Sequence, residues 1–265
     1  MRRELRALYD ASPFAVENLS FRETLSLIYE KNGLSREDYF LEREIDEGFF
    51  KKIKSDFERA LSGEPLGYIL GRVPFFESDF FVEEGVLIPR RDSEVLVERA
   101  IEHLPQGSRF LDICTGSGCL GISVLKRRGD TRATLIDISK TALKVAEKNA
   151  SALGVIDRCE IKKINLFKCQ PSTLEPFDTI IMNPPYITKK EMEALPENVK
   201  REPRLALFGG EDGLDFYREV KRLFPEGKTL IFEIGHAQGD ALVEMFGGGE
   251  IIKDASGADR VFLKK

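Results

Sequence analysis

The sequence predicts an α/β fold: a doubly wound, mainly parallel sheet behind a small helical domain. Two observations predict it. From about residue 90 onward, apolar segments of strand length alternate with segments of helical spacing, as in a parallel sheet covered by helices. Over residues 1–72, apolar residues recur at helical spacing only. A chain of 265 residues is long enough for both domains.

Composition narrows the class of protein. Hydrophobic residues make up 42% of the chain, which is enough for packed cores. The formal net charge of -5 does not favour general binding to a nucleic-acid backbone. The 4 Cys and 2 His show neither a disulfide framework nor a zinc spacing, so no metal is expected. No signal-peptide pattern follows Met1 and no apolar run has membrane length, so we expect a cytoplasmic protein with no membrane partner.

The N-terminal domain is expected to be a helical bundle. One apolar helical repeat begins at Phe21, behind Asn18 and Ser20, either of which is a suitable helix cap. Residues 35–38 have the Ser-x-x-acid form of a capping box, which predicts a short helix after them. A further apolar stripe over 49–61 stops just before a glycine.

The remaining chain is divided into a linker and a larger domain. Residues 73–88 are interpreted as a hairpin linker, because two aromatic runs flank a Glu-Ser pair. Residues 89–265 form the α/β domain. Its strands are expected at 109–113, 133–136, 159–164, 179–182, 229–233 and near 260–263, with helices after residue 92, from residue 119 and over 139–153.

A glycine-rich loop follows the first strand of the larger domain. Gly116, Gly118 and Gly121 satisfy Gly-x-Gly-x-x-Gly between a predicted strand and a predicted helix, where glycines let a nucleotide approach the backbone. Asp137 ends the next strand, where a carboxylate can bind ribose hydroxyls. A dinucleotide and S-adenosylmethionine both present such a ribose. Asp112, just before the loop, favours S-adenosylmethionine, because its charge would repel a pyrophosphate and attract a sulfonium or ammonium.

An Asn-Pro-Pro-Tyr segment after the fourth strand indicates the reaction. Its two prolines form a stiff, extended corner. The side-chain carbonyl of Asn183 and the main-chain carbonyl of Pro184 offer two acceptors, and the ring of Tyr186 offers a flat surface. This set suits a planar –NH2 group, as in a base amine or a side-chain amide. Hydrogen bonds from that group would orient its lone pair toward a sulfonium methyl without a metal or a strong base.

The chain resembles the HemK/PrmC family of glutamine methyltransferases, which modify peptide chain release factors. The resemblance rests on the glycine loop, on residues 183–187, on residues 87–90 and on two segments more specific to the family, 63–71 and 202–217. It implies a Rossmann-like class I methyltransferase sheet with an antiparallel strand at the C-terminal edge. It also implies S-adenosyl-L-methionine as donor, S-adenosyl-L-homocysteine as product, and methylation of the glutamine side-chain amide in the Gly-Gly-Gln motif of class I release factors.

Carried over residue by residue, the resemblance implies a site. The expected cofactor-binding residues are Asp112, Cys114, Thr115, Gly116, Ser117, Gly118, Asp137, Leu166 and Asn183. The expected substrate-binding residues are Asn183, Pro184, Pro185 and Tyr186, and of these Asn183, Pro184 and Tyr186 are the expected catalytic residues. Three positions depart from the family pattern: Cys114 stands where relatives often carry glycine, Arg91 replaces a frequent proline, and Asn165 stands where an aspartate commonly addresses the adenine amine.

Other interpretations stay open. An adenine exocyclic-amine methyltransferase acting on DNA or RNA would use the same acceptor slot, but it needs a basic track that the net charge of -5 does not show. We therefore expect release factors as partners and no stable nucleic-acid binding. A non-catalytic cofactor-binding scaffold and an NAD-dependent oxidoreductase are weaker alternatives. Residues 202–215 are interpreted as a lid or a solvated loop, and His236 as a residue near the site.

Overall fold

Contacts divide the protein into two compact units. The computed structural model describes residues 2–12, 16, 19–35, 46–174 and 176–265. One unit comprises Met1–Arg72 with Pro196–Arg201, and the other comprises Val73–Leu195 with Glu202–Lys265. The helix predicted to follow residues 35–38 and the alternative cap Asn18 lie outside the described residues.

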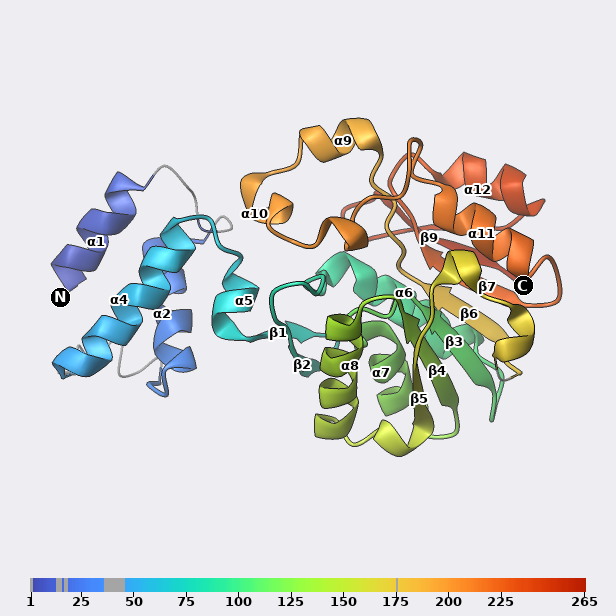
Figure 1. Cartoon of the computed structure of the whole chain (residues 1–265), viewed down its shortest axis with the longest axis horizontal. Helices are drawn as coiled ribbons and strands as arrows, with labels where there is room; N and C mark the ends of the chain where they lie inside the picture. The colour runs from blue at the N-terminus through green and yellow to red at the C-terminus, as the bar shows by residue number, and fades with distance from the viewer. Residues whose placement is uncertain (1, 13–15, 17–18, 36–45, 175) are drawn as a thin grey trace. The chain divides into compact units, whose positions relative to one another are not determined.

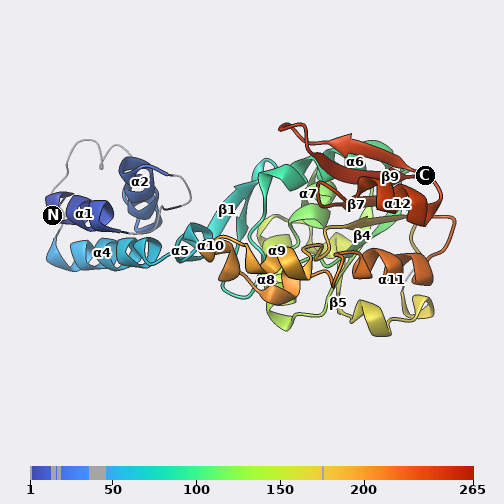
Figure 2. The ribbon, with the colours of Figure 1, turned by 90° about the horizontal axis from the view of Figure 1, so that it is seen from above.

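The first unit is helical, as its apolar spacing predicts. Its helices are α1 (Arg2–Ala11), α2 (Phe21–Lys31), α4 (Glu47–Leu61), α5 (Leu66–Leu70) and α10 (Glu197–Lys200). Ser20 caps α2 in a capping box with Glu23, and Asp46 caps α4. In both views α1 and α2 lie against α4 (Figures 1 and 2), and their apolar faces meet in one core around Leu25 and Phe57.

The second unit is built on a sheet of seven strands in the order β5-β4-β3-β6-β7-β9-β8. The strands are β3 (Arg109–Ile113), β4 (Arg132–Asp137), β5 (Cys159–Lys163), β6 (Thr179–Met182), β7 (Thr229–Glu233), β8 (Glu250–Lys253) and β9 (Asp259–Lys264). The first five strands in this order, β5, β4, β3, β6 and β7, are parallel and lie side by side in Figure 1. β9 pairs antiparallel with β7, and β8 pairs outside it. The predicted fold class is confirmed.

Helices cover both faces of this sheet. They are α6 (Glu94–His103), α7 (Cys119–Arg127), α8 (Lys140–Ala152), α11 (Asp215–Leu223) and α12 (Gly239–Phe246). The connections also contain α9 (Lys189–Glu193) and the short 3-10 turns η1 (Arg91–Ser93), η2 (Ile156–Arg158), η3 (Leu166–Lys168), η4 (Pro171–Thr173) and η5 (Arg204–Ala206). Within β3, Phe110 packs among residues of α6 and α7, whereas Leu111 packs among residues of α11 and α12. Because successive side chains of a strand point to opposite faces of the sheet, each central strand contributes to a hydrophobic core on both faces.

The segment interpreted as a hairpin linker, residues 73–88, overlaps a hairpin of β1 (Arg72–Phe75) and β2 (Ser78–Phe81), which begins one residue earlier. Phe75 and Phe80 are buried in the core formed with α6 and α7. The main chain of Phe81 exchanges two hydrogen bonds with the side chain of Asn149 on α8. The hairpin is therefore packed into the second unit. Among the described residues, no helix is long and apolar enough to cross a membrane.

Candidate functional site

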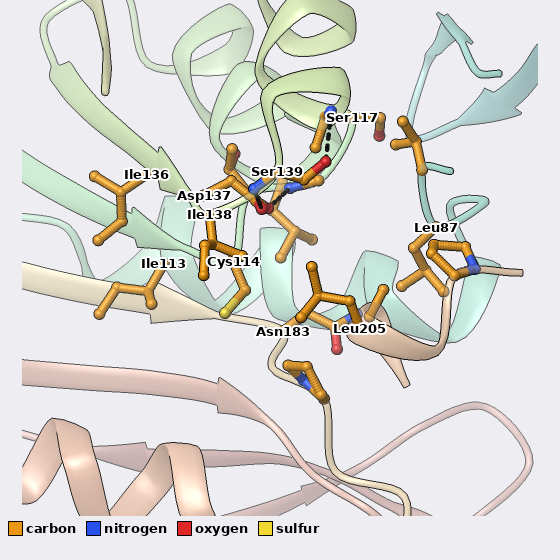
Figure 3. Close-up of a pocket in the computed structure, with 18 of the residues that line it drawn as sticks. Leu87, Ile113, Cys114, Ser117, Ile136, Asp137, Ile138, Ser139, Asn183 and Leu205 are labelled. Carbon is orange, nitrogen blue, oxygen red and sulfur yellow. Dashed lines mark hydrogen bonds between the residues drawn. The ribbon is translucent and has the colours of Figure 1, made fainter. Parts of the chain in front are cut away.

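A pocket lies where the parallel strands of the second unit end. Its walls come from the residues that follow β3, β4, β5 and β6, together with residues before α6 and residues around η5. β3 is the strand at which the winding direction changes, since β4 lies on one side of it and β6 on the other. Ligands of doubly wound sheets bind at this switch point. Figure 3 shows Ile113, Asp137, Asn183 and Leu87 arranged around the pocket.

The glycine loop forms the wall at the end of β3. Cys114, Thr115, Gly116 and Ser117 line the pocket, whereas Gly118 does not. Gly118 has φ 80° at the start of α7, and a Cβ there would lie 2.6 Å from Ile122 Cδ1. Cys114 has φ 59°, in the left-handed region that favours glycine. A side chain at position 118 would be strained by this positive φ and would require Ile122 and Ala146 to shift.

Asp137, at the end of β4, holds this loop in place. Its Oδ2 accepts the Gly116 N–H at 3.0 Å and its Oδ1 accepts the Ser139 N–H at 2.8 Å, as dashed lines mark in Figure 3. Burial raises the pKa of this carboxyl, and the main-chain N–H groups oppose that shift. Each carboxylate oxygen has a further lone pair, so Asp137 can still bind hydroxyl groups of a ligand in the pocket.

Asp112 lies beneath the loop and does not line the pocket. It is completely buried, and its Oδ2 accepts the Thr115 hydroxyl at 2.6 Å and the Gly121 N–H at 3.1 Å. Burial raises its pKa to about 7. Asp112 was expected beside the ligand because of its charge, whereas in the structure it ties the loop to the start of α7.

The Asn-Pro-Pro-Tyr segment forms the facing wall. Asn183 and Pro185 line the pocket, whereas Pro184 and Tyr186, which the sequence predicted to bind the substrate, do not. The Asn183 side-chain nitrogen donates to Ser93 Oγ at 3.3 Å. The Tyr186 hydroxyl donates to Glu233 Oε1 at 3.2 Å, and burial raises the pKa of this hydroxyl well above its ordinary value. Tyr186 therefore stays protonated and cannot serve as a base at neutral pH.

Residues 207–213, here called the brace, support the Asn-Pro-Pro-Tyr segment. The Ile187 N–H donates to Leu207 O, and the Gly209 N–H donates to Ile187 O, both at 2.9 Å. The Gln238 side chain donates to the main-chain oxygens of Tyr186 and Gly213. The sequence left a lid and a solvated loop open for residues 202–215; within that range, the structure pairs the backbone of the brace with Ile187.

Replacing Gly209 by alanine is expected to destabilise the protein by about 1–3 kcal/mol, as overpacking does. The new Cβ would lie 2.5 Å from Pro185 O and 2.7 Å from Tyr186 Cα, and backbone atoms cannot move aside cheaply. Thermal unfolding measures the effect. Gly129→Ala is the matched control, since nothing lies within 4 Å of a Cβ at that position. Equal unfolding temperatures for the two variants would contradict the close contact.

Sequence reasoning missed residues before α6 and around η5 that close the pocket. Glu202 Oε2 accepts the Ile88 N–H at 3.0 Å, and its Oε1 accepts from Arg90. This buried carboxylate joins the segment before α6 to the start of η5. The segments 87–90 and 202–217 carry the family resemblance, which was a signal for them, but the pairing between them could not be predicted from spacing.

Three large hydrophobic side chains are exposed among the described residues, and all of them line the pocket. Ile138 is 40% exposed, Phe167 is 49% exposed and Leu205 is 57% exposed. These three side chains therefore add apolar surface to the pocket, as is usual for sites that bind small molecules. Leu166 also lines the pocket. The side-chain carbonyl of Asn165, which was expected to accept from the adenine amine, accepts the Phe167 N–H at 3.0 Å instead.

The thiols near the pocket are unsuited to nucleophilic chemistry. Burial raises the pKa of Cys114 well above its ordinary value and raises that of Cys119 to about 12. His236 is exposed and does not line the pocket. Within the described ranges, no group of three or more His, Cys, Asp and Glu side chains could hold a metal ion.

Comparison with known proteins identifies the family. Residues 91–204 match the family model described as Methyltransferase small domain. A release factor glutamine methyltransferase of Clostridium acetobutylicum is 37% identical, over 84% of this chain and 82% of its own length. One of Geobacter sulfurreducens is 39% identical, over 77% and 74%. The chain belongs to the release factor glutamine methyltransferase family.

A solved structure extends the comparison to the fold. The catalytic domain of hMettl16, in complex with the MAT2A 3'UTR hairpin 6, matches with a TM-score of 0.53 and 16% identity, over 71% of this chain and 74% of that one. Membership of the release factor glutamine methyltransferase family confirms the resemblance predicted from the sequence. It also makes the protein a methyltransferase, in preference to an NAD-dependent oxidoreductase or a non-catalytic scaffold.

Proposed function

We propose that this protein transfers a methyl group from S-adenosyl-L-methionine to the side-chain amide nitrogen of the glutamine in the Gly-Gly-Gln motif of class I release factors. S-adenosyl-L-homocysteine is the other product. Family membership supports this substrate. The observation that carries the proposal is the Asn183 hydrogen bond to Ser93. With one amide N–H directed to Ser93, the side-chain carbonyl oxygen is the acceptor that Asn183 can offer to a substrate –NH2.

The residues of the pocket fit the cofactor. Asp137 has lone pairs for the ribose hydroxyls, and the loop 114–117 presents its main chain without bulky side chains. Leu166 and the exposed Ile138 offer apolar surface to the adenine. Asp112 supports cofactor binding indirectly, because its hydrogen bonds hold the glycine loop in place. When bound, S-adenosylmethionine supplies a methyl group activated by a positively charged sulfur.

The acceptor slot orients the nucleophile. The lone pair of an amide nitrogen is delocalised into its carbonyl, so a free amide is a weak nucleophile. The Asn183 side-chain carbonyl accepts one of its N–H groups, which orients the nitrogen and returns electron density to it. The proton that leaves the nitrogen can go to water. Neither the protonated Tyr186 nor a buried thiol is required as a base.

The alternative substrate is the exocyclic amine of adenine in DNA or RNA, which the same acceptors would fit. The family named above and the net charge of -5 support the protein substrate. The proposal therefore includes release factors as partners, no stable binding of nucleic acid, and the cytoplasm, where release factors work, as the place of action.

Methyl transfer from labelled S-adenosylmethionine is expected to label a class I release factor, but not DNA or RNA oligonucleotides, at equal substrate concentrations. A release factor with Gly-Gly-Ala in place of Gly-Gly-Gln is the matched control and should stay unlabelled. Label in adenine with none in the release factor would refute the proposal.

A further inference from the structure

A buried carboxylate lies beside the acceptor slot and has no part in the reaction described above. Glu233 ends β7 and is 2% exposed. Its Oε1 accepts the Tyr186 hydroxyl at 3.2 Å, and its main-chain oxygen accepts the Tyr217 hydroxyl at 2.7 Å. Its Oε2 is buried without a hydrogen bond of normal geometry among the described residues. Burying a carboxylate is costly, so its place beside the slot calls for a role.

Ser93 connects this carboxylate to Asn183. Ser93 is 2% exposed and its Oγ accepts the Asn183 side-chain N–H at 3.3 Å. The Ser93 hydroxyl also lies close enough to Glu233 to lower the pKa of that carboxyl. A serine hydroxyl that accepts a hydrogen bond still has its own proton to donate. An ionised carboxylate only accepts, so Glu233 is a natural receiver of that proton.

We propose that Glu233 is a positioning residue that sets the direction of hydrogen bonding in the acceptor slot. The Ser93 hydroxyl donates toward Glu233, the Asn183 nitrogen donates to Ser93, and the Asn183 carbonyl is left for the substrate. The same carboxylate holds Tyr186, at the other end of the segment. This inference rests on the proposed function, because it assumes a substrate –NH2 that needs acceptors.

The opposite direction would disable the slot. If the Ser93 hydroxyl donated to the Asn183 carbonyl, the side-chain –NH2 of Asn183 would face the –NH2 of the substrate, and two donors do not bond. The direction of a buried hydrogen-bond chain is fixed by its end group. An acceptor-only end group therefore keeps Asn183 in the productive orientation.

Charged and titratable groups face Glu233 from several elements. Burial raises its pKa, while Ser93, Arg260 and Tyr186 lower it and Asp92 raises it. Arg260 on β9 is shared with Asp92 and Asp254. The charge of Glu233 in turn helps to raise the pKa of Tyr217 on α11 and that of Cys119 on α7. As pH falls through the raised pKa, Glu233 gains a proton and becomes able to donate to Ser93. We therefore expect kcat to fall on the acid side of the pH profile.

The test uses the full chain with a release factor as substrate and compares Glu233→Gln, Ser93→Ala and the double variant with wild type. Glutamine keeps the shape of Glu233 but can donate to Ser93. We expect Glu233→Gln to lower kcat at least about tenfold, to leave S-adenosylmethionine affinity within about twofold, and to remove the acid limb of the pH profile. In the Ser93→Ala background, Glu233→Gln should cause little further loss of kcat, because the route to Asn183 is already broken.

Asp254→Asn is the matched control, since it removes another carboxylate beside Arg260 without touching the slot. Wild-type kcat in Glu233→Gln would overturn the inference. Losses that multiply in the double variant, or a loss that coincides with lower unfolding temperature and weaker cofactor binding, would also overturn it. If Glu233→Gln does not fold, Ser93→Ala alone decides: unchanged kcat in that variant contradicts the inference. Failure of the wild-type enzyme to methylate a release factor refutes the proposed function instead.

Discussion

Replacing Asn183 by alanine is expected to lower kcat for methyl transfer by about 10²- to 10³-fold, the cost of removing one well-placed hydrogen-bonding group from an active site. Without the side chain, the substrate amide loses an acceptor, and its nitrogen is no longer held in line with the methyl group. Asn183 lines the pocket through a side chain that Ser93 holds. Removing it should leave the glycine loop and Asp137 unchanged.

Two assays separate this expectation from a general loss of structure. Single-turnover methylation measures the chemical step, and calorimetry measures S-adenosylmethionine affinity, which should stay within a few-fold of wild type. Asn198→Ala is the matched control, since Asn198 lies on α10 and not in the pocket. A parallel loss of cofactor affinity and of unfolding temperature would show that Asn183 acts as a structural residue.

Replacing Asp137 by alanine is expected to weaken S-adenosylmethionine binding by about 10²-fold, because hydrogen bonds to a charged group contribute about 1.5–3 kcal/mol each. Two effects add. The ribose loses its carboxylate partner, and the Gly116 N–H loses the acceptor that holds the loop. Asp137→Asn keeps one acceptor oxygen and should fall between alanine and wild type.

Titration calorimetry with S-adenosylmethionine measures this change directly. Asp240→Ala serves as control, because Asp240 is an exposed residue in the first turn of α12. If Asp137→Ala kept wild-type affinity and lost only kcat, the carboxylate would belong to the substrate and not to the cofactor.

The central strands could be predicted from the sequence closely. The predicted bounds of β3, β6 and β7 agree with the structure, because strands buried on both faces are continuous apolar runs that turns end abruptly. β8 was missed, since Glu250–Lys253 holds two isoleucines between charged ends, a pattern too short to distinguish from a loop. α12 was also missed, because glycines at both of its ends resemble a turn.

The site could be predicted in part. The glycine loop and the Asn-Pro-Pro-Tyr segment are local patterns, and the structure places both in the walls of one pocket. The contacts that orient them join distant parts of the chain: Ser93 and Asn183 are 90 positions apart, and Ile88 and Glu202 are 114 apart. Periodicity describes elements and not their tertiary partners. Asp112 shows the same limit, because spacing did not reveal that its carboxylate turns under the loop.

The central claim is that the pocket methylates a side-chain amide held by Asn183. Fragmentation mass spectrometry of a class I release factor, treated with the enzyme and isotope-labelled S-adenosylmethionine, tests it most directly. We expect one labelled methyl group on the glutamine of Gly-Gly-Gln, located on the side-chain nitrogen, and none with Asn183→Ala. A methyl group on another residue, or equal labelling by the Asn183→Ala enzyme, would contradict it.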